Sequence, residues 1–179
     1  GAKGLVLLPY LASATTPRWN PHARGTLLGL TFAHDRACMA RAFMEGITME
    51  VRDMVNSMVS AGIPIEQVRI LGGATKSDVW NQMQADIYNR PVQTLRMTDA
   101  ALMGAALFAA VGIGAFRDIP QGTEAMVRVD RQYAPDPKAA AVYDGIYDIY
   151  CRAYDALVPA TLALAPSFDR FTAIGVESA

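Results

Sequence analysis

A short apolar run leads directly into two glycines and then into a helical pattern, a succession typical of a strand-to-helix turn. Residues 68–71 predict a buried strand, Gly72 and Gly73 follow it, and Ser77 is a good cap for the next helix. Glycines at a strand-to-helix turn let a ligand approach the backbone, and the first helical turn offers unpaired N–H groups. Tight packing of the strand on the helix also explains such a turn, so the motif alone leaves both interpretations open.

Helical and strand patterns alternate on both sides of this turn. Apolar side chains recur at helical spacing over 35–60, and Pro64 follows the end of that helix. In the helix that Ser77 begins, five side chains are expected to face inward: Val79, Trp80, Met83, Ile87 and Tyr88. A short strand at 92–95 and an Ala-rich buried helix at 98–111 come next. Strands that alternate with helices at this spacing predict an α/β layered domain.

The last predicted helix begins at Pro137, which suits a first helical turn, and runs to about residue 158. One of its faces carries Ile146, Ile149, Ala153 and Leu157. A second stripe consists of Tyr143, Tyr147, Tyr150 and Tyr154. We interpret this stripe as an edge packed on the core rather than as an aromatic binding site. The alternative is that the stripe and the uncharged run 100–116 mediate a homodimer. Residues 161–179 are expected to form a loosely attached tail.

Charge and cysteine usage argue against several classes of partner. A formal net charge of -1 and an isoelectric point near 6.1 give no reason to expect binding to nucleic acid or to an anionic membrane. The run 100–116 is shorter than the roughly 20 residues that span a bilayer. Cys38 and Cys151 stand far apart, which predicts two structural thiols in a reducing, cytoplasmic setting. The chain begins with neither Met nor a secretion signal, so we expect a fragment of a longer protein.

Residues 72–77 are superficially similar to a phosphate-binding P-loop, because Lys76 and Ser77 stand at the start of a helix. The P-loop pattern requires glycines one and six residues before the lysine, where this chain has Thr75 and Ile70. A P-loop is therefore excluded.

The remaining titratable side chains form no catalytic set. His22 and His34 stand apart, without a carboxylate or cysteine at ligand spacing, so no metal site is predicted. Glu45 lies in the first helix and is either a buried hydrogen-bonding group or a surface acid. No side chain in this sequence presents itself as a general base.

The most specific signal is a series of short motifs that begins near the N-terminus and ends at residue 74. Its members are Leu8-Pro9-Tyr10-Leu11, Thr16-Pro17, Asn20-Pro21-His22-Ala23-Arg24-Gly25, Gly29-Leu30-Thr31, His34, Ala40-Arg41-Ala42, Glu45-Gly46, Arg52-Asp53 and Gly72-Gly73-Ala74. This series resembles the C-terminal domain of the FGGY carbohydrate kinases, and within that family most resembles the xylulokinases, with glycerol kinase as a more distant relative. The resemblance covers roughly residues 4–157.

The resemblance implies part of a two-domain enzyme with the actin-like, ribonuclease H-like ATPase fold, an α/β fold whose mixed sheet is flanked by helices. Residues 1–160 would form the nucleotide-binding C-terminal domain, with its start truncated. By similarity, Gly72, Gly73 and Ala74 would lie against the adenosine part of ATP, and Ser77 would occupy the polar position that follows. The absent N-terminal domain would supply most sugar contacts and the catalytic aspartate, so this chain alone is expected to be inactive.

The reaction that the resemblance implies is transfer of the γ-phosphoryl group of ATP to a sugar or polyol hydroxyl, with Mg²⁺ bridging phosphate oxygens. D-Xylulose is the preferred substrate hypothesis. Residues 12–15 read Ala-Ser-Ala-Thr where xylulokinases usually have Ser-Gly-Glu-Arg, so ribulose, a tetritol, glycerol and a quorum-signal sugar are alternatives. A non-catalytic, actin-like sensor of nucleotide or sugar is an alternative from another functional class.

Overall fold

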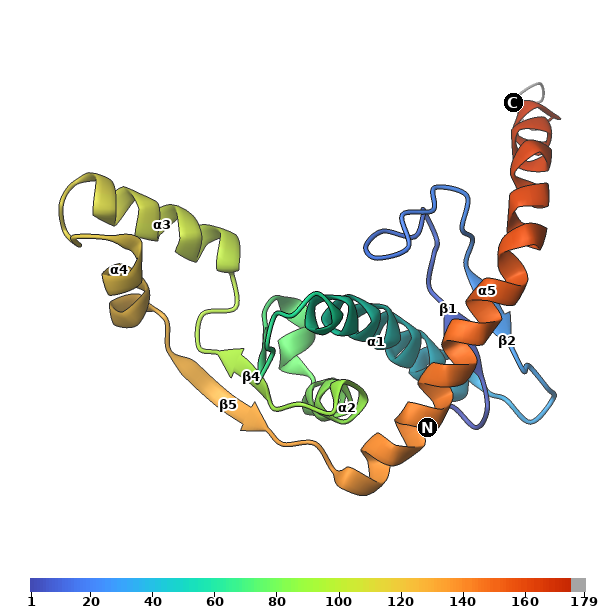
Figure 1. Ribbon diagram of the computed structural model, residues 1–179, viewed down its shortest axis with the longest axis horizontal. Coiled ribbons are helices and arrows are strands. Elements are labelled where there is room, and N and C mark those ends of the chain that lie inside the picture. The colour runs from blue at the N-terminus through green and yellow to red at the C-terminus, as the bar shows by residue number, and fades with distance from the viewer. Residues whose placement is uncertain (175–179) are drawn as a thin grey trace. The chain divides into compact units, whose positions relative to one another are not determined.

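The computed structural model describes residues 1–174, with the side chains of residues 1–164, and divides the chain into two compact units (Figure 1). The first unit combines Gly1–Ile63 with the chain from Ala141 onward, and the second is Pro64–Ala140. The sequence predicts one domain over 1–160, whereas the contacts separate a central stretch from the two stretches that flank it.

The first unit is built from two short strands and two long helices. Its elements are β1 (Val6–Leu8), β2 (Thr26–Leu28), α1 (Arg36–Ser60) and most of α5 (Pro137–Ile174). Strands β1 and β2 pair antiparallel, with Val6 opposite Leu28. Helix α1 begins where the carboxylate of Asp35 accepts a hydrogen bond from the N–H of Cys38 at 2.8 Å. The predicted helix over 35–60 is therefore confirmed, and Asp35 is its cap.

Glu45 lies inside the first unit and is a buried hydrogen-bonding group rather than a surface acid. Its residue is 4% exposed, and the carboxylate accepts hydrogen bonds from Arg41 Nε at 2.8 Å and from the Tyr143 hydroxyl at 2.9 Å. A buried carboxylate needs such partners, because desolvation without them is costly. These contacts join α1 to α5.

The tyrosine face of α5 is its buried face. Tyr150 is fully buried, and its hydroxyl lies 2.6 Å from that of Tyr10. The guanidinium of Arg18 lies 3.9 Å from the ring centroid of Tyr154 and donates to Asp53 at 2.7 Å. The prediction of a stripe packed on the core is confirmed. The expected apolar face is less buried than that stripe, because aromatic rings cover more area; Ile149, for example, is 46% exposed.

Burial in this unit makes its stability sensitive to alkaline pH. Burial raises the pKa of Tyr10 to about 12 and that of Tyr143 to about 12. A raised folded-state pKa means that the stabilisation is complete below the ordinary tyrosine pKa of about 10 and is lost as pH rises through the folded value. Between about pH 10 and pH 12 we therefore expect tyrosinate absorbance to increase while the near-ultraviolet circular dichroism of the folded protein is lost. Ionisation at the ordinary pKa with unchanged dichroism would contradict this.

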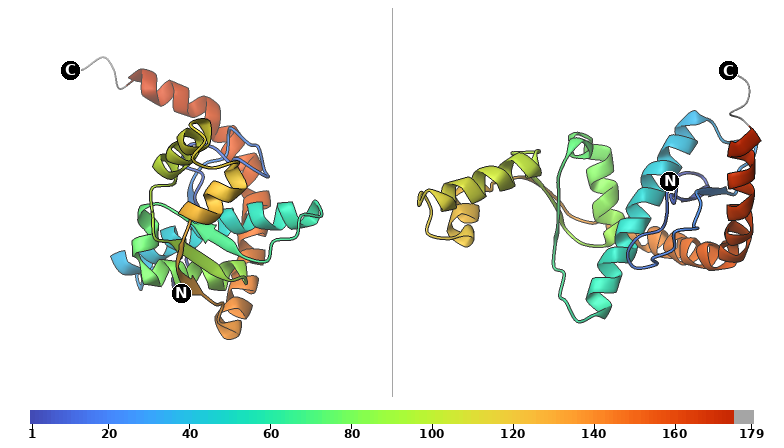
Figure 2. Two further views of the ribbon diagram at one scale, coloured as in Figure 1. Left: turned by 90° about the vertical axis from the view of Figure 1, so that its left-hand side faces the viewer. Right: turned by 90° about the horizontal axis from the view of Figure 1, so that it is seen from above.

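The second unit is a three-stranded mixed sheet with helices. Its elements are β3 (Val68–Ile70), the 3₁₀ helix η1 (Gly73–Lys76), α2 (Asp78–Tyr88), β4 (Val92–Leu95), α3 (Ala100–Gly112), α4 (Ile119–Met126) and β5 (Val129–Tyr133). The sheet order is β3-β4-β5, in which β4 runs parallel to β3 and antiparallel to β5. Helix α2 contacts β4 and β5, and Figure 2 shows α3 and α4 side by side beyond the ends of these strands. A mixed sheet flanked by helices is the predicted fold class.

Several local expectations for the second unit are wrong. Strand β3 is an edge strand with Arg69 exposed, not a buried strand, and Val79 on α2 is 62% exposed. Helix α3 is not buried: Leu107 is its single buried residue, and Phe108 is 69% exposed. Sequence periodicity also gave no sign of α4 or β5, because one is short and the other is mostly exposed and polar.

Helix α5 extends further than its sequence pattern indicates. The prediction ends at about residue 158, whereas the helix continues to Ile174, through most of the predicted tail. The last part of that tail, 175–179, lies outside the described residues. Among the described helices none is long and apolar enough to cross a membrane.

Candidate functional site

The turn between β3 and α2, residues 71–77, is held in shape by hydrogen bonds to its backbone. Gly72 has φ 86° and ψ -172°, a conformation open essentially to glycine alone. The N–H of Gly72 donates to the carbonyl of Thr98 at 3.0 Å. The carbonyl of Gly72 accepts from both the N–H of Thr75, at 3.2 Å, and its hydroxyl, at 2.7 Å. The sequence motif thus becomes a fixed loop that presents backbone on one side.

An open cavity of about 570 Å³ lies against this turn. Its lining consists of Leu71, Gly72, Gly73, Lys76, Thr98, Asp99 and Ala100. A Cβ built on Gly72 or Gly73 would have no atom within 4 Å, so both glycines face open space. The turn therefore leaves room for a ligand to reach the backbone, and tight packing does not account for these glycines.

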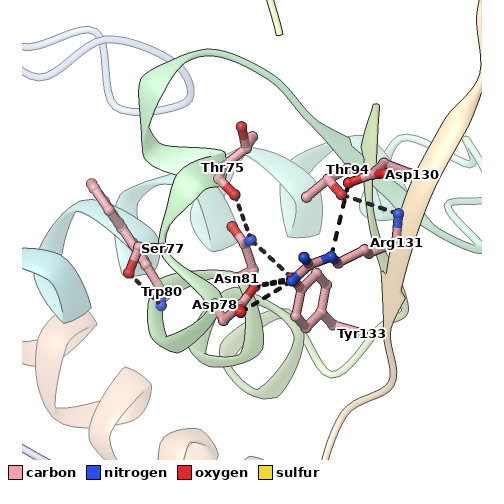
Figure 3. Close-up of polar contacts among 9 residues, drawn as sticks. All are labelled: Thr75, Ser77, Asp78, Trp80, Asn81, Thr94, Asp130, Arg131 and Tyr133. Atoms are coloured by element: carbon pink, nitrogen blue, oxygen red, sulfur yellow. Dashed lines mark hydrogen bonds and ion pairs between the residues drawn. The ribbon is translucent and has the colours of Figure 1, made fainter. Parts of the chain in front are cut away.

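The predicted site residues separate into two groups. Gly72 and Gly73 line the cavity, whereas Ala74 and Ser77 are absent from its lining. The hydroxyl of Ser77 instead caps α2, accepting from the N–H of Trp80 at 3.3 Å (Figure 3). The contacts of Ala74 and Ser77 with a nucleotide remain a prediction from family resemblance.

The charged groups at the cavity suit binding better than proton transfer. Lys76 brings an ammonium group to the lining. Asp99 is the one carboxylate in the lining, and it accepts the N–H of Leu102 at 3.0 Å as the cap of α3. Asp99 is the N-cap of α3. The cavity therefore offers contacts for a polar ligand, and its one carboxylate serves as a helix cap.

An apolar groove of about 210 Å³ adjoins the same cavity and shares Leu71 and Ala100 with it. The rest of its lining is Leu95, Met97, Met103, Gly104, Leu107, Val127 and Arg128. A ligand with both a polar and an apolar part would find matching surfaces in these neighbouring hollows.

A polar network under the turn joins three elements of the second unit (Figure 3). Asn81 on α2 donates to the carbonyl of Thr75 at 2.8 Å and to the Tyr133 hydroxyl at 3.2 Å. Tyr133 donates to Asp78 at 2.6 Å, and Arg131 donates to the same carboxylate at 2.8 Å. The hydrogen bond from Tyr133, followed by the charge of Arg131, lowers the pKa of Asp78.

Sequence reasoning missed this network. Asn81 is not among the five side chains that the sequence predicts on the inward face of α2. One sequence signal was available: Asn81 lies four residues after the cap Ser77, on the same side of the helix as the turn. Tyr133 and Arg131 gave no signal, since β5 was not predicted and its register with β4 is a tertiary property.

Metal coordination finds no support in this part of the protein. Within the described residues no group of three or more His, Cys, Asp or Glu side chains could hold a metal ion. Among the residues whose side chains are described, none forms a set that fits a protein-bound Mg²⁺ site, and we assign that ion to none of them.

Comparisons with known proteins point to one family. The model of the FGGY family of carbohydrate kinases, C-terminal domain, matches residues 1–113. The chain is 37% identical over 150 residues to a xylulose kinase of Staphylococcus epidermidis, a match covering 84% of this chain and 30% of that protein. The chain thus spans about 30% of the length of this curated relative.

Solved structures agree in fold with the described residues. A ligand-bound xylulose kinase from Lactobacillus acidophilus superposes with a TM-score of 0.82 at 30% identity, covering 92% of this chain and 34% of that one. A Plasmodium falciparum glycerol kinase with ADP superposes with a TM-score of 0.71 at 25% identity, covering 86% of this chain and 31% of that one.

Proposed function

Because this chain belongs to the FGGY family of carbohydrate kinases, we propose that it is part of a cytoplasmic enzyme that transfers the γ-phosphoryl group of ATP to a hydroxyl of a sugar or polyol. The observation that carries the proposal is the turn at Gly72 and Gly73, which leaves its backbone open to a cavity of about 570 Å³. A solved relative is a glycerol kinase with ADP. We assign the turn to the adenosine part of ATP.

In this proposal the chain binds and orients the nucleotide. The backbone of Gly72 and Gly73 meets the adenosine, and Ala74 and Ser77 complete the contact as the family resemblance implies. Lys76 is near enough to the cavity to offer positive charge to an anionic ligand. ATP, when bound, supplies the phosphoryl group; positioning it is the contribution of this chain.

The remaining machinery belongs to another part of the enzyme. The family resemblance implies that the base that takes the proton from the sugar hydroxyl lies in a sugar-binding domain outside these residues, and we assign it there. The exposure of helix α3 is an argument that another part of the enzyme covers it, because Leu102 and Phe108 are 66% and 69% exposed. A helix that is apolar on all sides is normally covered. Residues 1–160 are then the nucleotide-binding domain of the full enzyme.

D-Xylulose is the proposed substrate, with xylulose 5-phosphate as product. It is supported by 37% identity to a xylulose kinase and by the TM-score of 0.82 with another. Glycerol is the alternative that a specific comparison favours, through the glycerol kinase structure. Ribulose, a tetritol or a quorum-signal sugar remain further substrates to test, and a nucleotide or sugar sensor without transfer is the competing class.

The test is ADP release by the full reading frame that contains this chain, with ATP, Mg²⁺ and a panel of ketoses, aldoses and polyols. We expect turnover with one pentulose and weaker turnover with the others. Turnover with glycerol alone would reassign the substrate. Nucleotide binding without turnover on any acceptor would favour the sensor, and absence of nucleotide binding would refute the proposed site.

A further inference from the structure

Asn81 is an unusual residue for the interior of a helix. It lies in α2 and is 0% exposed, and both hydrogen bonds of its carboxamide go to residues outside α2. Its Nδ2 donates to the carbonyl of Thr75 in η1 and to the hydroxyl of Tyr133 in β5 (Figure 3). Burying a side-chain amide costs stability unless such bonds are made, so the position is a demanding one.

The first of these bonds controls the shape of the turn. Thr75, whose carbonyl Asn81 holds, is also the residue whose N–H and hydroxyl both donate to the carbonyl of Gly72. A continuous chain of hydrogen bonds therefore leads from the buried side chain of Asn81 to the glycine that borders the cavity. Glycine enters this φ/ψ region readily but has other conformations open to it, so the chain of hydrogen bonds from Asn81 selects one shape for the turn.

The second bond fixes the orientation of the carboxamide. Tyr133 donates its only proton to Asp78, so its oxygen is left to accept from Nδ2 of Asn81. Arg131 holds Asp78 from the other side. The Oδ1 atom of Asn81 is buried without a hydrogen-bond partner among the described residues. The two bonds that Nδ2 donates are therefore the hydrogen bonds of this carboxamide among the described residues.

We propose that Asn81 is a positioning residue for the nucleotide: it holds the turn at Gly72 and Gly73 in the shape that the adenosine part of ATP requires. This inference rests on the proposed function and adds a residue outside the cavity lining. Asn81 touches no ligand itself, so its removal changes nucleotide affinity and leaves the sugar side of the reaction intact.

The experiment compares Asn81→Leu with Gln84→Met in the full reading frame. Both replace a buried amide of α2 by an apolar side chain of similar size, but Gln84 bonds to Tyr88, away from the turn. We expect Asn81→Leu to raise the KM for ATP about tenfold, the effect of one lost buried hydrogen bond. The kcat at saturating ATP and the KM for the sugar should stay within about twofold, and Gln84→Met should change none of the three.

The outcomes separate this inference from the proposed function. A folded Asn81→Leu variant with unchanged KM for ATP, or with both KM values raised equally, overturns the positioning role while the kinase stands. Wild-type protein that neither binds nor uses ATP overturns both. If Asn81→Leu does not fold, the Tyr133→Phe variant tests the inference instead. Removing the hydroxyl that orients Asn81 should raise the KM for ATP by about threefold and leave the KM for the sugar unchanged. An unchanged KM for ATP refutes the inference.

Discussion

Replacing Gly73 by alanine is expected to raise the KM for ATP at least about tenfold in the full enzyme, because a methyl group forced into a filled site costs roughly 1–3 kcal/mol. The substitution meets no obstacle in the structure itself. No atom lies within 4 Å of the added Cβ, and Gly73 does not have the positive φ that only glycine adopts readily. Any penalty must therefore come from the bound nucleotide. Thermal melting without ligand should be unchanged, and nucleotide titration should show the loss.

Gly72→Ala is the matched control for this prediction. Gly72 also faces open space, but its φ of 86° strains any other residue, at a cost of about 1–3 kcal/mol. We expect Gly72→Ala to lower stability with or without nucleotide, whereas Gly73→Ala acts only when ATP is present. A Gly73→Ala enzyme with normal KM for ATP would remove the turn from the binding site. A lowered melting temperature without ligand would show that protein, rather than nucleotide, covers Gly73.

Replacing Gly46 by alanine is expected to destabilise the first unit by about 2 kcal/mol, the typical cost of overpacking a filled core. The added Cβ would lie 2.6 Å from the carbonyl oxygen of Leu7 and 2.9 Å from its Cβ. Helix α1 crosses β1 at this point, so one element would have to move away from the other. The more favourable helix propensity of alanine offsets only part of that cost. Chemical denaturation of the variant and wild type measures the difference.

Gly145→Ala is the matched comparison, since it makes the same change in the other long helix of this unit. Its Cβ would have no atom within 4 Å, so only the propensity gain of about 0.5–1 kcal/mol remains. The two variants should therefore shift stability in opposite directions. Equal shifts would mean that the α1 and β1 backbones are further apart than the structure places them.

The fold class followed from patterns that depend on neighbours in the chain. The Asp35 cap and the 3.6-residue period of α1 depend on residues close together in the chain. The same is true of the Ser77 cap and of the strand that precedes it. Local hydrogen bonds and amphipathic spacing determine such elements, which is why the helix over 35–60 and the strand–turn–helix at Gly72 were correctly predicted. Where the apolar period is absent, as in α4 and β5, periodicity gave no signal.

The candidate site was predicted in part for the same reason. Gly72 and Gly73 carry a local signature, since glycines between a strand and a helix expose backbone. Their fixed shape, however, is set by Thr98 and, through Thr75, by Asn81, and Asn81 is oriented by Tyr133 from a strand that sequence reasoning did not foresee.

Residue types at short spacing were enough to indicate the family, the alternation of strands and helices, the glycine turn and the inward-packed tyrosine face of α5. The burial of Glu45, the exposure of α3 and the position of Asn81 beneath the turn are known from the tertiary structure alone. Burial and long-range hydrogen bonds depend on which distant segments meet, and no local pattern specifies that pairing.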